Sequence, residues 1–98
     1  MLASTACEAL RNRKRLELRY HGYTRVVEVD TVVISTAGNP MINCWQVRGG
    51  SNSQEGTGWR NFKLDEALSA HVIDEESNAH RDPYVRGASQ FKSIICEI

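Results

Sequence analysis

The run TRVVEVDTVVIS, residues 24–35, constrains the fold more than any other part of the chain. Most of its residues are β-branched, and such side chains favour an extended strand over a helix. Alternate residues of a strand face opposite sides, and one side of this run changes from acidic at Glu28 and Asp30 to apolar at Val32 and Ile34. We therefore expect a bend or bulge near Asp30, which moves the strand from one part of a sheet to another.

Shorter segments with the same alternation lie before and after this run. They predict further strands at residues 15–20, 41–48, 59–64 and 70–74, separated by turn-forming sequences such as His21-Gly22 and TAGNP. The last segment, FKSIICEI, fits either a final strand or a partner-binding segment.

Ahead of the strands, Thr5 and Glu8 have the spacing of a capping box, which predicts a short helix at about residues 5–13. The predicted fold is mostly β (α+β), with this helix followed by a small, closed, five- to six-stranded barrel of SH3-like or Sm-like type. A chain of 98 residues supports one core and one domain. That domain is residues 1–98, with the barrel at about 15–75 and a C-terminal extension at 76–98.

The charges of the chain are balanced in number but separated along the sequence. Residues 1–63 carry nine Lys or Arg and five acidic residues, whereas residues 64–98 carry three and seven. A net charge of zero argues against a dedicated binder of duplex DNA. The separation fits a face that attracts anions, a contact between two chains, or a solvated surface.

Three cysteines, Cys7, Cys44 and Cys96, lie far apart in the sequence and form no C-x-x-C motif. An odd and scattered set predicts reduced thiols rather than a disulfide framework. The N-terminal sequence lacks a basic leader with an apolar core, and no apolar run reaches 18 residues. We therefore expect a cytoplasmic protein.

No motif for catalysis or for cofactor binding is present. The glycines of RGGSNSQEGTG have neither the G-K-[ST] sequence nor the G-x-G-x-x-G spacing of phosphate-binding loops. The histidines, His21, His71 and His80, are widely separated and far from the cysteines, so no metal site is indicated. We expect no enzyme activity, no cofactor and no metal.

Basic and aromatic residues do recur together on the predicted strands. Arg25, Arg48, Arg60 and Lys63 lie close in sequence to Tyr20, Trp45, Trp59 and Phe62. Guanidinium groups bind phosphate, and flat rings stack on bases, so the mixture suits an anionic, ring-bearing ligand. Alternatively, most of the rings form the core while the basic residues extend outward into solvent.

Several of these segments resemble the WYL domain, a bacterial regulatory module with an Sm-like barrel. In that family, a strand that ends in an aromatic residue leads through a turn and a basic residue to a β-branched strand, as Tyr20 and Arg25 do here. The family's Trp-Tyr-Leu strand is matched by Trp-Gln-Val at residues 45–47, and its R-x-F-[RK]-L-D segment by residues 60–65.

The similarity covers roughly residues 6–75. Gln46 stands where the family has its name-giving tyrosine. The helix-turn-helix domain that usually precedes a WYL domain does not precede the first predicted strand.

The resemblance implies a sensor domain that binds a nucleotide or a short or single-stranded nucleic acid and regulates transcription or an effector protein. On this basis, Arg60 and Lys63 would contact phosphates, and Arg25 would close the site from the neighbouring strand. No bond would be made or broken.

The resemblance also assigns the remaining site residues. Tyr20 or Trp45, with Gln46 next to it, would supply a ring contact, and Arg48 and Trp59 would form a lid on either side of the glycine-rich loop. The alternative function is a protein-interaction or oligomerisation subunit without a small ligand. In that case the two oppositely charged segments, or FKSIICEI added to the sheet of a second chain, would make the contact.

Overall fold

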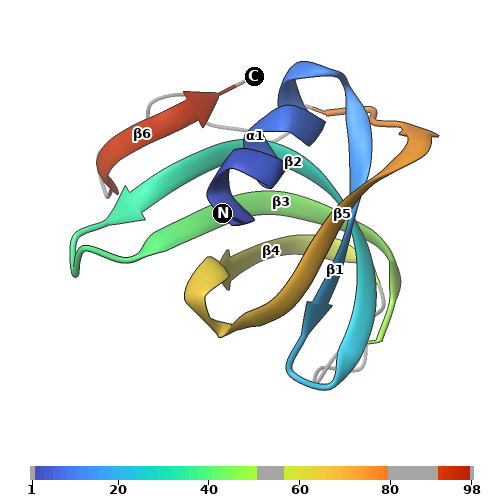
Figure 1. Cartoon of the computed structure of the whole chain (residues 1–98), viewed down its shortest axis with the longest axis horizontal. Helices are drawn as coiled ribbons and strands as arrows, with labels where there is room; N and C mark the ends of the chain where they lie inside the picture. The colour runs from blue at the N-terminus through green and yellow to red at the C-terminus, as the bar shows by residue number, and fades with distance from the viewer. Residues whose placement is uncertain (1, 51–56, 80–90, 98) are drawn as a thin grey trace.

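The computed structural model describes residues 2–50, 57–79 and 91–97. One helix precedes a strongly curved antiparallel sheet, so the mostly β fold with a short N-terminal helix is confirmed (Figure 1). The elements in chain order are α1 (Leu2–Arg11), β1 (Lys14–Tyr20), β2 (Tyr23–Ser35), β3 (Pro40–Gly49), β4 (Gly58–Lys63), the 3-10 helix η1 (Leu64–Glu66), β5 (Ala67–Glu76) and β6 (Phe91–Glu97).

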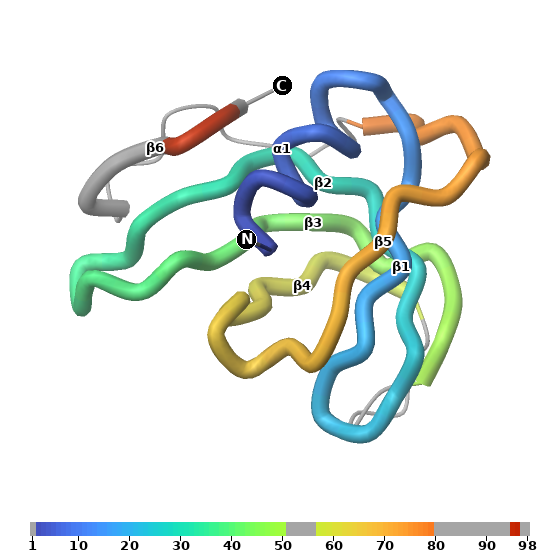
Figure 2. Tube along the Cα trace, in the orientation of Figure 1, coloured from blue at the N-terminus to red at the C-terminus, as the bar shows by residue number. Residues whose placement is uncertain are grey.

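The sheet has the strand order β4-β3-β2-β1-β5, and β6 pairs with β2 outside this path. Closure into a barrel was predicted, and this prediction is wrong: within the described residues, β4 and β5 are joined through η1 but are not hydrogen-bonded to each other. The strands curve around a shared interior (Figure 2). A short β4 of six residues gives β5 little backbone with which to pair.

The irregularity predicted near Asp30 is confirmed. Val29 pairs with Cys44 of β3 and Thr31 pairs with Asn43, so Asp30 is an extra residue in β2. The pairing of β2 with β1 ends at Val27, and the pairing of β2 with β6 begins at Thr31. Because of the bulge, the first half of β2 pairs with β1 and the second half pairs with β6.

Helix α1 begins earlier than the capping box predicted, because Thr5 lies inside the helix rather than before it. Leu2 and Ala3 pack against the core, and this apolar contact extends the helix toward the N-terminus. The buried face of α1, formed by Ala6, Cys7, Ala9 and Leu10, covers the sheet interior. Tertiary packing therefore decides where this short helix starts.

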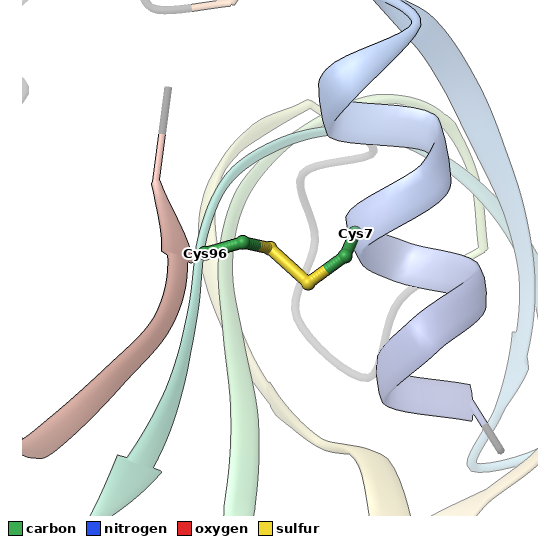
Figure 3. The surroundings of a disulfide bond; sticks show 2 residues. All are labelled: Cys7 and Cys96. Atoms are coloured by element: carbon green, nitrogen blue, oxygen red, sulfur yellow. A yellow bond between two sulfur atoms is a disulfide. The ribbon is translucent and has the colours of Figure 1, made fainter.

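A disulfide joins Cys7 of α1 to Cys96 of β6 (Figure 3). The two Cα atoms are 6.0 Å apart although 89 positions separate the residues in sequence. The prediction of reduced thiols is wrong for this pair, because the fold brings the two ends of the chain together and sequence spacing does not show it. Cys44 is a free, buried cysteine.

The remaining strand predictions are right in position and differ in length. β5 extends over Ala67–Glu76 instead of residues 70–74, since η1 takes only Asp65 and Glu66 of the five residues expected between the two strands. The segment FKSIICEI contributes β6, a strand of the chain's own sheet. No helix of the described residues has the length and apolar character needed to cross a bilayer.

Candidate anion-binding site

The alternation of β3 and β4 divides the predicted site residues between two faces of the sheet. Cys44 pairs with Arg60 and Gln46 pairs with Gly58 on the inner face, which also holds buried Phe62. The outer face carries the pair Trp45 and Trp59, followed along the strands by Asn43 with Asn61 and Met41 with Lys63. The structure therefore does not bring Lys63 and the two tryptophans together with Arg60.

Arg25 lies on the inner face and is almost completely buried, with 3% of its surface exposed. Its guanidinium carbon is 5.5 Å from the ring centroid of Tyr20, 5.4 Å from that of Tyr23 and 5.0 Å from that of Phe62. These distances are those of cation–π contacts, which stabilise a desolvated guanidinium by about 2 kcal/mol. Three rings therefore hold this charge inside the sheet.

The polar contacts of Arg25 are to neutral groups. Nε donates to the carbonyl of Tyr20 (3.3 Å), and a terminal nitrogen donates to Oε1 of Gln46 (3.5 Å). Gln46, which is fully buried, donates in turn to the carbonyl of Gly50 (3.1 Å). Among the residues whose placement is described, no carboxylate forms an ion pair with Arg25.

Arg60 lies beside this buried charge and is only half-buried. One of its terminal nitrogens donates to the carbonyl of Trp59 (3.0 Å), and the same nitrogen lies over Gly58, 3.1 Å from where a Cβ would be. Burial, followed by the positive charge of Arg60, lowers the pKa of Arg25. We call these two guanidinium groups the arginine pair; the positive charge of Arg60 disfavours the charged form of Arg25.

Cys44 lies below the arginine pair on the same face. Its thiol donates to the carbonyl of Arg60 (3.6 Å), and burial raises its pKa far above the ordinary value. A thiol in this state is not a nucleophile at neutral pH. The hydrogen bond of Cys44 to β4 therefore helps to position β4 against β3.

Tyr20 forms one wall of the site. Its hydroxyl accepts from the backbone N–H of Lys63 (3.2 Å) and donates to Oε1 of Glu66 (3.4 Å), while burial raises its pKa. The ring stacks on His21 at 4.1 Å between centroids, and Nε2 of His21 lies 2.7 Å from the same carboxylate oxygen. Contacts with His21 in the turn after β1 and with Glu66 in η1 therefore hold Tyr20 in place. Its ring faces the guanidinium of Arg25.

Lys63 extends from the other face of β4, and its Nζ is 3.8 Å from Oε2 of Glu66. Trp45 and Trp59 form an edge-to-face pair with centroids 5.4 Å apart. Both tryptophans are half-buried, which fits a cross-strand pair that stabilises the outer face. The assigned phosphate contact of Lys63 and the lid role of Trp59 would act on this outer face.

Arg48 also belongs to the outer face, where it is bound to Glu75 through two hydrogen bonds of 2.8 and 2.5 Å. Arg15 donates both to Glu75 (3.1 Å) and to the fully buried carboxylate of Glu28 (3.1 Å). The hydrogen bond from Arg48, then that from Arg15, lowers the pKa of Glu75 to about 2. Arg48 is thus engaged in an ion-pair network that joins β1, β2, β3 and β5.

Two parts of the site were not foreseen from the sequence. Tyr23, 38% exposed, packs across Gly50, where a Cβ would overlap the tyrosine ring. At Gly49, with φ +114°, a Cβ would meet the backbone of Thr24 and Arg25. The Gly-Gly sequence at the end of β3 was the available signal, because glycine is required where a backbone or ring approaches this closely.

The described residues contain no group of three or more side chains suited to a metal ion. In comparisons with known proteins, no family model, no curated protein and no solved structure matches the chain.

Proposed function

We propose that this chain is a non-enzymatic regulatory domain that binds an anionic, ring-bearing ligand, a nucleotide or a single-stranded nucleic acid, at the arginine pair. The observation that supports the proposal is Arg25, a buried guanidinium whose described partners are three rings, a carbonyl and an amide. A second guanidinium, Arg60, stands close enough to lower its pKa.

The energetics of such a pair favour an anion. A buried charge without a counter-charge has a desolvation cost of several kcal/mol, and a like charge beside it adds to that cost. A phosphate between Arg25 and Arg60 would reduce both costs through charge-assisted hydrogen bonds. Arg60 is the accessible member, so it would meet the ligand first.

Tyr23 supplies the ring contact in this proposal. It lies beside Arg25 and is 38% exposed, whereas Tyr20 and Phe62 are buried behind the guanidinium. A base or another flat ring would stack on the exposed part of Tyr23 while its phosphate meets Arg60. Gln46, bonded to both Arg25 and Gly50, links the site to the end of β3.

The family and the cellular role belong to the same proposal. A strand order of β4-β3-β2-β1-β5 with a 3-10 helix between β4 and β5 supports an opened SH3-like or Sm-like arrangement of the WYL type. Ligand occupancy would then be passed to an effector that controls transcription.

The proposed cytoplasmic location has lost one of its supports, because the disulfide between Cys7 and Cys96 is a bond typical of oxidising compartments. Alkylation of the protein directly after lysis, followed by mass measurement, tests it. Alkylated, and therefore reduced, Cys7 and Cys96 would support the cytoplasmic location, whereas an intact bond that protects both from alkylation would favour an oxidising compartment.

The test of the ligand is a titration of a fluorescently labelled, single-stranded oligonucleotide, followed by anisotropy at several salt concentrations. Two phosphate contacts predict a slope of log K against log salt of about −1.4, and Arg60→Ala should reduce its size by about 0.7. The matched control is Arg19→Ala, which removes the same charge from an exposed residue of β1. Absence of binding at low salt, or equal effects of the two substitutions, refutes the proposal.

A further inference from the structure

Within the described residues, the C-terminal strand is hydrogen-bonded to one other strand only. β6 pairs with Thr31–Ser35 of β2, and its register is irregular at two points in this short ladder. Among the residues whose burial is described, Cys96 is the member of β6 that enters the core cluster. The sheet of β1–β5 and helix α1 share the rest of that core, so most of the described packing does not need β6.

The edge of β2 that receives β6 is a specific docking place. It exists because the bulge at Asp30 takes β2 away from β1 and leaves the backbone of Thr31–Ser35 without β1 as a neighbour. An edge of this kind pairs with any extended segment whose side chains fit it. The segment known to fit is the chain's own β6.

The connection between β5 and β6 is long relative to the molecule. Residues 77–90 can span about 46 Å when extended, whereas the longest dimension of the structure is 29 Å. The length of this connection therefore does not oblige β6 to pair with the β2 strand of its own molecule.

We propose that two copies of this chain dimerise by exchanging β6, so that each β6 pairs with Thr31–Ser35 of the other copy and its Cys96 is bonded to Cys7 of that copy. Every β6 contact of the monomer is reproduced in the dimer, which is the general reason that such exchange is accessible. This inference concerns a surface distinct from the arginine pair and does not depend on the proposed ligand.

The disulfide controls the exchange. Cys7 is 3% and Cys96 8% exposed, so a thiol reaches the bond only after β6 has moved away from α1. A small thiol such as glutathione then attacks Cys96, forms a mixed disulfide and releases the thiolate of Cys7. The Cys7 thiolate of a second copy attacks that mixed disulfide at Cys96, which regenerates the small thiol, and the number of disulfides is unchanged.

Isotope labelling tests the exchange without any substitution. Equal amounts of ¹⁵N-labelled and unlabelled full-length chain are reduced, unfolded and refolded together at high concentration in a glutathione buffer, and the cross-linked peptides that contain Cys7 and Cys96 are analysed by mass spectrometry. In a fully exchanged dimer about half of these peptides carry one labelled and one unlabelled partner. Size-exclusion chromatography with light scattering shows whether the mixed peptides come from the dimer fraction.

The control is the same mixture combined only after each chain has been refolded and its free thiol blocked, which should give no mixed peptides. Mixed peptides in a dimer fraction support the exchange. A refolded mixture in which all cross-linked peptides are purely labelled or purely unlabelled refutes it, whatever the oligomeric state.

Discussion

Removal of the disulfide should cost this protein a large part of its stability. The bond closes a loop of 89 positions, and the chain-entropy relation gives a stabilisation of about 4.6 kcal/mol at 25 °C for a loop of this length. Whole domains of this size are stabilised by only about 5–15 kcal/mol. The double variant Cys7→Ala/Cys96→Ala should therefore unfold at a temperature about 20 °C lower than the oxidised protein.

The assays are thermal unfolding and urea unfolding of both proteins, each with and without a phosphine reductant. Reductant should lower the free energy of unfolding of the natural chain and leave that of the double variant unchanged, which separates the loss of the bond from the loss of two side-chain atoms. Cys44 remains in both proteins, so it cannot cause the difference. A stabilisation below about 1 kcal/mol would show that the unfolded chain is not restrained by this bond and would contradict the prediction.

Three further predictions concern single residues. Arg25→Met should abolish ligand binding yet change the free energy of unfolding by less than about 1 kcal/mol, because an apolar side chain of similar length removes the desolvation cost of the buried charge; a large loss of stability in urea would contradict this. Glu75 has a pKa of about 2 in the folded protein and an ordinary value of 4.5, so its contribution is complete above pH 4.5 and is lost as the pH falls toward 2. Glu75→Gln should therefore flatten the pH dependence of stability in that interval. Gly49→Ala should destabilise the fold by about 2 kcal/mol, since φ is +114° and the Cβ would meet the backbone of Thr24 and Arg25, whereas Gly38→Ala, with open space around it, should cost less.

Most of the local structure of the sheet, namely the positions of its strands and of the bulge, could be predicted from the sequence. Alternation located β1 to β4, and the change in polarity along residues 24–35 located the bulge at Asp30 because a buried strand must match its surroundings on both faces. The end of the chain was foreseen as a strand among two possibilities. Alternation does not show which distant strands are hydrogen-bonded to each other. The prediction of a closed barrel therefore failed, because β4 and β5 are not paired within the described residues.

The sequence predicted which types of residue the site contains, but it did not predict how they are arranged. Basic and aromatic residues do lie on β3 and β4, but strand parity places Arg60 with Arg25 inside and Lys63 with Trp45 and Trp59 outside. Parity is readable from the sequence, whereas the face that turns inward depends on the curvature of the whole sheet. Arg48 was assigned to a lid because its partner, Glu75, is 27 positions away and meets it only in the fold.

The disulfide shows the same limit more strongly. Cys7 and Cys96 lie near opposite ends of the sequence, and their pairing follows from the contact of α1 with a strand that docks on the far half of β2. Cysteine number and spacing indicated reduced thiols, since those rules use no information about distant contacts. The disulfide forms because the fold brings Cys7 and Cys96 close together.

The most direct test of the arginine pair is the NMR signal of each guanidinium Nε–H group during titration with a short single-stranded oligonucleotide. The Nε–H of Arg25 donates to the carbonyl of Tyr20, and this bond protects it from solvent exchange. The signals of Arg25 and Arg60 should shift together and saturate with one dissociation constant, while the signal of exposed Arg19 stays in place. Unmoved signals of Arg25 and Arg60 at oligonucleotide concentrations that shift Arg19 would contradict it.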